Sequence, residues 1–276
     1  SVYSAPIGTP YRDLIRKAGG SLNPDDVIID GGPMMGMIIN DLDQGISKTT
    51  SGILSLPKNH FIVSMHRISI SQMVKRSKAA CCQCFRCSDL CPRNLLGHNL
   101  YPHKTMRTID YIQSEPTEHI TSAFLCSQCG VCELIACDSM LLSPRKIYAE
   151  YRQLLKDRGI TNPHQRSGFN ARESLPYGKV AIPVVLKKLG ISEYAVPTPY
   201  RGDIDVTRVR VPLNRHTGAP AVPVVGTDDQ VKRGDPIATI PEDQLGANYH
   251  ASIPGKIIEI TNEYIEIHNN CNGATY

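Results

Sequence analysis

The chain has 276 residues, of which 41% are hydrophobic and 6% aromatic, and its formal net charge is +4. This weak positive charge is spread along the chain, so it gives no reason to expect a nucleic-acid or anionic-membrane partner. No apolar run approaches the roughly 20 residues that span a bilayer. The length predicts two or three small domains rather than one.

The chain begins at Ser1 in sequence that already looks structured, so we expect a fragment or a processed product. Residues 1–74 are typical of a small α+β unit. Thr9 and Pro10 predict a helix start, with the threonine as N-cap and the proline at the first helical position. Gly19 and the glycine after it predict the end of this helix.

Residues 27–29 then predict a buried strand that leads into a glycine-rich turn at 30–36. A phosphate loop is the functional alternative for such a turn, but the G-K-[ST] signature is missing. Glycines that permit the turn are therefore favoured over ligand binding. Residues 51–57 predict a closing strand.

Nine of the ten cysteines lie between residues 81 and 137, and the tenth is Cys271. The first run reads C-x2-C-x2-C-x3-C-P and ends at Pro92, which is the bacterial spacing of ligands to a cubane iron–sulfur cluster. A second run starts at Cys126. Two such runs predict two 4Fe–4S clusters.

Three thiolates spaced along a tight loop can reach three corners of one cube, and the fourth ligand comes from the other run. We therefore assign two crossed ligand sets, which are Cys81, Cys84, Cys87 and Cys137 for the first cluster, and Cys126, Cys129, Cys132 and Cys91 for the second. The second run departs from the pattern in two ways. Four residues separate Cys132 from Cys137, and Asp138 stands where proline is usual.

Zinc and disulfides are the alternatives for these cysteines. A structural zinc site needs only four of them, and disulfide frameworks are typical of short secreted chains with a signal peptide, which is not visible here. Clusters are favoured, and they indicate a reducing compartment. Cys82 and Cys271 are expected to be bystanders, and His98 and His103 are expected to be polar neighbours of the clusters.

The remaining segments predict helices around the clusters and strands after them. Residues 102–114 have helical spacing, and Ser143 with the proline after it opens a longer helix that Gly159 ends. A proline- and glycine-rich linker follows, with a short helix at 184–189. The domains expected are a β-grasp unit at 1–74, a helical cluster domain at 75–160, a linker at 161–200 and a β module at 201–276.

The last of these resembles the barrel-sandwich fold of biotinyl and lipoyl carrier domains. Such carriers present a lysine in a hairpin, whereas here the corresponding connection at 241–248 has none and Lys256 lies inside a predicted strand. We therefore expect a structural or docking module without a covalent cofactor.

The run G-T-P-x-R-x-L-I-x-x-A-G-G at residues 8–20, with the strand and Gly-Gly that follow, resembles the SLBB-type β-grasp domain of the NADH-oxidising subunit of respiratory complex I. Together with the cysteines and their flanks at 91–98 and 142–146, it makes the chain similar to the PduS-type cobalamin reductases of propanediol-utilisation microcompartments. That family is related to the C subunit of the Rnf complex. The fold class expected is thus α+β and multidomain.

The resemblance implies electron transfer from NADH and flavin to cob(III)alamin and cob(II)alamin, which reactivates coenzyme B12 for a diol dehydratase. In the family, FMN and NADH bind an N-terminal domain that is missing here, so this chain is expected only to transfer electrons. Whether it is an enzyme by itself stays open. The alternatives are an Rnf-type subunit between NADH and ferredoxin, and a non-redox scaffold that metal stabilises.

The same resemblance implies the partners and the location. These are a flavin/NADH domain or flavoprotein donor, a corrinoid acceptor or an adenosyltransferase, and a microcompartment shell protein. The expected location is cytoplasmic, inside a bacterial microcompartment.

Overall fold

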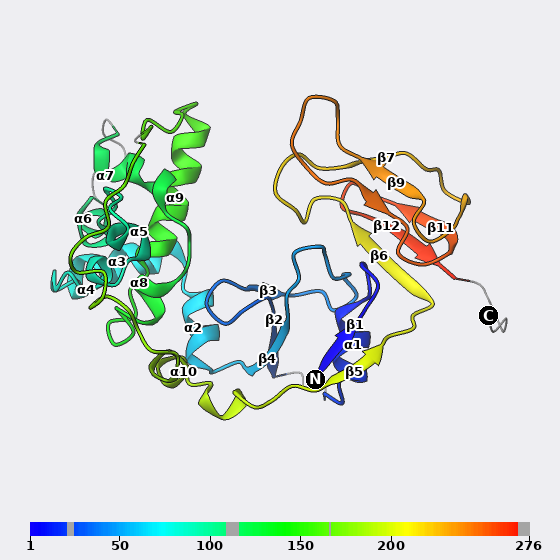
Figure 1. Cartoon of the computed structure of the whole chain (residues 1–276), viewed down its shortest axis with the longest axis horizontal. Helices are drawn as coiled ribbons and strands as arrows, with labels where there is room; N and C mark the ends of the chain where they lie inside the picture. The colour runs from blue at the N-terminus through cyan, green and yellow to red at the C-terminus, as the bar shows by residue number, and fades with distance from the viewer. Residues whose placement is uncertain (21–24, 109–115, 166, 270–276) are drawn as a thin grey trace. The chain divides into compact units, whose positions relative to one another are not determined.

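The computed structural model describes residues 1–20, 25–108, 116–165 and 167–269 (Figure 1). Cys271 and the second half of the helix predicted at 102–114 lie outside these residues. The described residues pack as two compact units, one from 1–31, 38–55 and 197–276, the other from 32–37 and 56–196. This division concerns packing, and the four domains predicted from the sequence stay a prediction.

One helix and a three-stranded sheet open the first unit, with bounds α1 (Tyr11–Lys17), β2 (Asp26–Asp30), β3 (Met37–Ile39) and β4 (Ile53–Pro57). The strand order is β3-β2-β4. Tyr11 and Ile15 of α1 form one buried cluster with Ile28 of β2 and Ile39 of β3. Burial of this apolar face accounts for a seven-residue helix that would not be stable alone.

The start of α1 differs from the prediction. Pro10 is the cap residue, in an extended conformation with φ −59° and ψ 140°, and the helix has no side-chain cap. The hydroxyl of Thr9 instead donates a hydrogen bond of 2.7 Å to the carbonyl oxygen of Pro6. The predicted threonine cap is therefore wrong, whereas the predicted end is confirmed, because Gly19 follows the helix at φ +79°.

The remaining strands of the first unit are short: β1 (Val2–Ser4), β5 (Tyr200–Asp203), β6 (Arg208–Pro212), β7 (Val222–Pro223), β8 (Gln230–Val231), β9 (Pro236–Thr239), β10 (Tyr249–His250), β11 (Gly255–Ile260) and β12 (Tyr264–His268). β1 pairs with β5 in parallel. The others form two sheets, β6-β12-β11-β8 and β10-β9-β7. Alternating side chains such as Val209 and Val211 meet Ile237 and Ile265 in one shared core. Lys256 lies in β11, as predicted.

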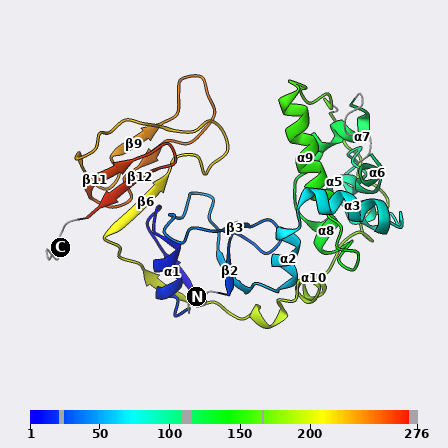
Figure 2. The ribbon, with the colours of Figure 1, turned by 180° about the vertical axis from the view of Figure 1, so that it is seen from behind.

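The second unit is helical, with α2 (Phe61–Arg67), α3 (Ile70–Ala80), α4 (Arg86–Asp89), α5 (Pro92–Leu95), α6 (Pro102–Arg107), α7 (Glu118–Thr121), η2 (Ser122–Leu125), α8 (Val131–Leu134), α9 (Pro144–Asp157), α10 (Ile182–Leu189) and η3 (Ser192–Tyr194). Seen from behind, α9 runs along the shorter helices (Figure 2). Its start is confirmed, because the hydroxyl of Ser143 accepts the N–H of Lys146 at 3.1 Å. Its buried face includes Tyr148 and Tyr151.

The segment predicted as a linker hydrogen-bonds to the second unit. Arg172 donates its backbone N–H to the carbonyl oxygen of Leu95 at 2.9 Å and its Nε–H to that of Asn94 at 2.8 Å. Gly178 lies against Leu95 so closely that a Cβ there would be 2.4 Å from it. None of the helices in the described ranges is both long and apolar enough to cross a bilayer.

Candidate metal centre

The two cysteine runs fold into loops with the same backbone pattern. Gln83 and Gln128, each two residues after the first cysteine of its run, have φ values of +54° and +58°. Phe85 and Gly130, two residues further, have φ values of +62° and +80° and precede the short helices α4 and α8. These left-handed turns curl each run, so that cysteines three residues apart face the same side.

The glutamines of these turns also contact sulfur. Gln83 donates its side-chain Nε2–H to Cys81 Sγ at 3.1 Å. Gln128 donates both its backbone N–H and its side-chain Nε2–H to Cys126 Sγ, each at 3.4 Å. Such donors stabilise negative charge on a sulfur ligand.

The first thiol cavity is the one lined by all four cysteines predicted for the first cluster, with Cys82 beside them: Cys81, Cys84, Cys87 and Cys137. Burial raises the pKa of Cys87 to about 12, and the neighbouring thiolates of Cys137, Cys81 and Cys84 add to the effect. Burial likewise raises the pKa of Cys137 to about 11. Cys84 and Cys82 are exposed, so this cavity reaches the surface.

The second thiol cavity is lined by the four cysteines predicted for the second cluster: Cys91, Cys126, Cys129 and Cys132. Burial raises the pKa of Cys91 to about 11, although backbone N–H groups of Asn94 and Arg93 act in the opposite direction. Cys91 and Cys132 are buried. This cavity is therefore the more enclosed of the two.

Each cavity suits a cluster that carries one iron per thiolate. Buried thiols with raised pKa values keep their protons at neutral pH unless a bound metal takes the proton's place. Among the described residues, no three histidine, cysteine or carboxylate side chains converge on one point that could hold a single ion. The thiols surround a space instead, and the donor set is all sulfur, as for 4Fe–4S clusters.

A buried ion pair borders the second thiol cavity. Glu133, which is 1% exposed, accepts a hydrogen bond from the hydroxyl of Ser143 and lies 2.5 Å from Arg145 Nη2. Burial raises the pKa of Glu133, against the opposing effect of Arg145. Arg145 also lines the cavity and donates from Nη1 to the carbonyl oxygen of Met34 at 2.9 Å.

The same carbonyl meets the second cysteine loop. A Cβ on Gly130 would lie 2.8 Å from the carbonyl oxygen of Met34. The loop at 32–37, which the sequence suggested was only a permissive turn, therefore packs beside the second thiol cavity. The available signal was the glycine at position 130, where the first run has Phe85.

The departure at Asp138 has a structural counterpart. Asp138 Oδ2 lies 2.5 Å from Lys188 Nζ of α10. Burial raises the pKa of Asp138, but the hydrogen bond and charge of Lys188 outweigh it, and the net pKa is lowered. An ion pair thus holds the segment after Cys137 where proline is usual.

The two predicted neighbours of the clusters have partners other than sulfur. His103 lines the first thiol cavity, and its Nδ1 lies 2.7 Å from the hydroxyl of Ser88. The ring of His98 stacks on that of Phe169, with centroids 4.0 Å apart.

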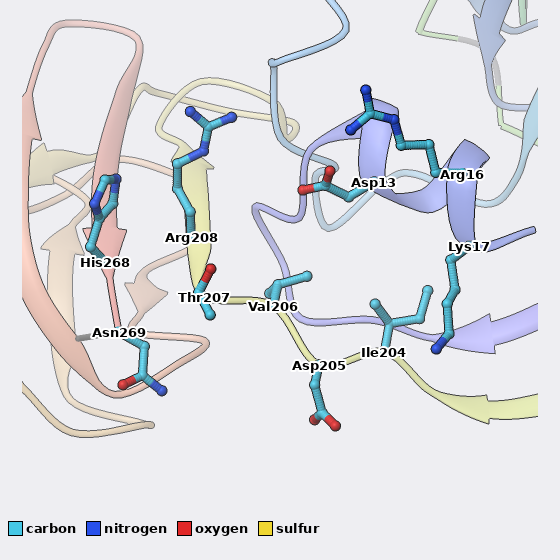
Figure 3. A pocket seen from close by; sticks show the side chains of 10 residues that line it. All are labelled: Asp13, Arg16, Lys17, Ile204, Asp205, Val206, Thr207, Arg208, His268 and Asn269. Carbon is cyan, nitrogen blue, oxygen red and sulfur yellow. The ribbon is translucent and has the colours of Figure 1, made fainter. Parts of the chain in front are cut away.

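A separate cavity in the first unit is lined by charges of both signs, from α1, β6, β12 and the chain before β6 (Figure 3): Asp13, Arg16, Lys17, Asp205, Arg208 and His268. Arg208 lies 3.3 Å from Asp43, and His268 lies 2.6 Å from Glu266. Because these two side chains are already paired, the cavity indicates no ligand class by its charge.

Comparison with known proteins gives two domain matches. Residues 80–142 match the 4Fe-4S dicluster domain, and residues 203–275 match the RnfC barrel sandwich hybrid domain. The first match covers all eight cysteines of the two predicted ligand sets, and the second covers the two sheets that share a core.

The decisive likeness extends over both units. The chain is 35% identical to cobalamin reductase PduS of Citrobacter freundii over 266 residues, which are 96% of this chain and 58% of the relative. The chain is a PduS homologue. The PduS of Salmonella typhimurium matches with the same identity and coverage. The RnfC-type protein of the ion-translocating oxidoreductase complex of Salmonella gallinarum is 33% identical over 98 residues, which are 35% of this chain and 13% of that protein. The chain spans a little over half the length of the PduS relatives.

Proposed function

We propose that the chain is the iron–sulfur electron-transfer part of a cobalamin reductase. The observation that carries this proposal is the gathering of eight cysteines around two cavities within a 4Fe-4S dicluster match. The name of the PduS relatives supplies the acceptor. The proposed ligand sets are the two crossed groups of four, in which Cys91 and Cys137 each join the run from which they are distant in sequence.

Bound clusters would supply one-electron transfer. The residues of this chain hold them, exclude water from the second thiol cavity and donate hydrogen bonds to sulfur through Gln83 and Gln128. In the complete reaction NADH would give up two electrons and one proton to a flavin outside this chain. Cob(III)alamin would take one electron to become cob(II)alamin and a second to become cob(I)alamin.

The finer assignments rest on the resemblance and are part of the same proposal. The sheet β3-β2-β4 with α1 packed on it supports an SLBB-type β-grasp at 1–74. FMN and NADH on a preceding domain, a flavoprotein donor, an adenosyltransferase, a shell protein and a place inside a microcompartment are proposed from the family resemblance.

Spectroscopy of the chain with its iron tests this function. We expect about eight irons per chain, which is four for each proposed cluster. Dithionite reduction should give a paramagnetic signal, and the reduced chain should reduce cob(III)alamin faster than ferredoxin. Cys82→Ser is the matched control, because Cys82 lies beside the proposed ligands but is not one. A redox-silent chain would leave the scaffold alternative, and preferential reduction of ferredoxin would favour the Rnf-type role, for which the 98-residue match speaks.

A further inference from the structure

Phe85 differs from its counterpart in the second cysteine loop in a way that needs a reason. Both Phe85 and Gly130 have a left-handed backbone, with φ +62° and +80°. Glycine adopts this conformation freely, whereas a residue with a Cβ is strained in it. Strain of this kind persists where a function requires the side chain.

The phenylalanine ring is also unusually accessible. Phe85 is 51% exposed and Met140 is 44% exposed, and both line the first thiol cavity. The ring of Phe85 meets that of His103 edge-on, with centroids 4.5 Å apart at 86°. One exposed cation, Arg86, lines the same cavity.

The second thiol cavity has no such ledge among the residues described around it. Cys91 and Cys132 are buried there, and the carbonyl of Met34 packs where a side chain on Gly130 would stand. An acceptor can therefore approach the first cavity more closely than the second.

We propose that Phe85, Met140 and Arg86 form the docking surface for the corrin ring of cobalamin. This proposal rests on the proposed function. A corrin is flat, with apolar faces and uncharged amide side chains, and cobalamin carries a single phosphodiester. An aromatic ring and a thioether suit the apolar face, and one guanidinium suits one phosphodiester. The match in shape and charge favours the corrin over a protein, whose stable interface would bury on the order of 800 Å² per partner.

The test measures binding and electron transfer separately, using the cluster-loaded chain and hydroxocobalamin. We expect Phe85→Ala and Phe85→Gly to weaken binding in equilibrium dialysis by roughly twofold to tenfold, as loss of an aromatic contact implies. Transfer from the dithionite-reduced chain to cob(III)alamin should slow in parallel, while oxidation by ferricyanide should not change. Tyr177→Ala is the control, because this tyrosine is 87% exposed in the same unit but does not line the cavity.

The glycine variant separates docking from folding. Phe85→Gly relieves the left-handed strain, so its helical unit should melt at a higher temperature than that of Phe85→Ala, although both bind cobalamin more weakly. Wild-type binding in both variants would overturn the proposal. So would slower transfer to ferredoxin with unchanged transfer to cobalamin, which would assign the surface to a protein. A wild-type chain that neither binds nor reduces cobalamin would overturn the proposed function itself, and the docking surface with it.

Discussion

Replacing Gly130 with alanine tests whether the loop at 32–37 is part of the second unit's packing. The left-handed backbone of Gly130 alone makes a Cβ unfavourable by about 1–2 kcal/mol. The new Cβ would also lie 2.8 Å from the carbonyl oxygen of Met34, which must then move. That carbonyl accepts a hydrogen bond from Arg145, and a bond to a charged group contributes about 1.5–3 kcal/mol. The expected loss of stability is therefore about 2.5–5 kcal/mol.

Gly159→Ala isolates the backbone effect. Gly159 has φ +67°, and nothing lies within 4 Å of the position that its Cβ would take. This control should lose only about 1–2 kcal/mol. For a unit of this size 1 kcal/mol lowers the melting temperature by about 3 °C, so the control should melt about 3–6 °C below the wild type and Gly130→Ala about 8–15 °C below.

The assay is helical circular dichroism during heating, which reports the second unit, together with the rate at which a chelator removes iron. Gly130→Ala should also release iron faster than Gly159→Ala, because the loop beside the second thiol cavity is displaced. Equal melting temperatures for the two variants would refute the packing of Met34 on Gly130.

Three further outcomes are expected. Cys91→Ala should damage the second cluster and Cys137→Ala the first, as seen in iron content and paramagnetic spectra; loss of the first cluster in Cys91→Ala with the second intact would contradict crossed ligation. A double-mutant cycle with Asp138→Asn and Lys188→Met should give a coupling of about 1 kcal/mol that salt weakens, and zero coupling at low salt would exclude a role for this ion pair. Burial and two nearby cations lower the pKa of His66 from 6.5 to about 4. The unfolded chain therefore binds this proton first, and stability should fall from pH 6.5 to pH 4 more steeply in the wild type than in His66→Asn; identical slopes would show that His66 does not titrate in this way.

Local signals predicted the elements whose stability is local. Ser143 and Gly159 mark the ends of α9 because a cap and a left-handed glycine act within one turn. Cysteine spacing predicted which thiols share a cavity, because a tight loop can aim three of them at one space. Cys137 joins the first of these groups despite the extra residue before it.

Contacts between distant segments could not be predicted in this way. Nothing near Met34 in the sequence indicates that its carbonyl meets Gly130 and Arg145. The pairing of Asp138 with Lys188 likewise joins residues 50 positions apart, one of them in a segment whose prolines and glycines suggested a free linker. Thr9 was misassigned because its hydroxyl has two local partners to choose from, and the turn at Pro6 competes with the helix.

The parallel pair β1–β5 has a consequence for the order of synthesis. Val2 pairs with Tyr200, so β1 has no partner strand until roughly 200 residues have been made. At about 5–20 residues per second this takes on the order of 10–40 s. Every residue of the second unit lies inside that interval. On the ribosome the thiols of both cavities are therefore all present before the first unit can be completed.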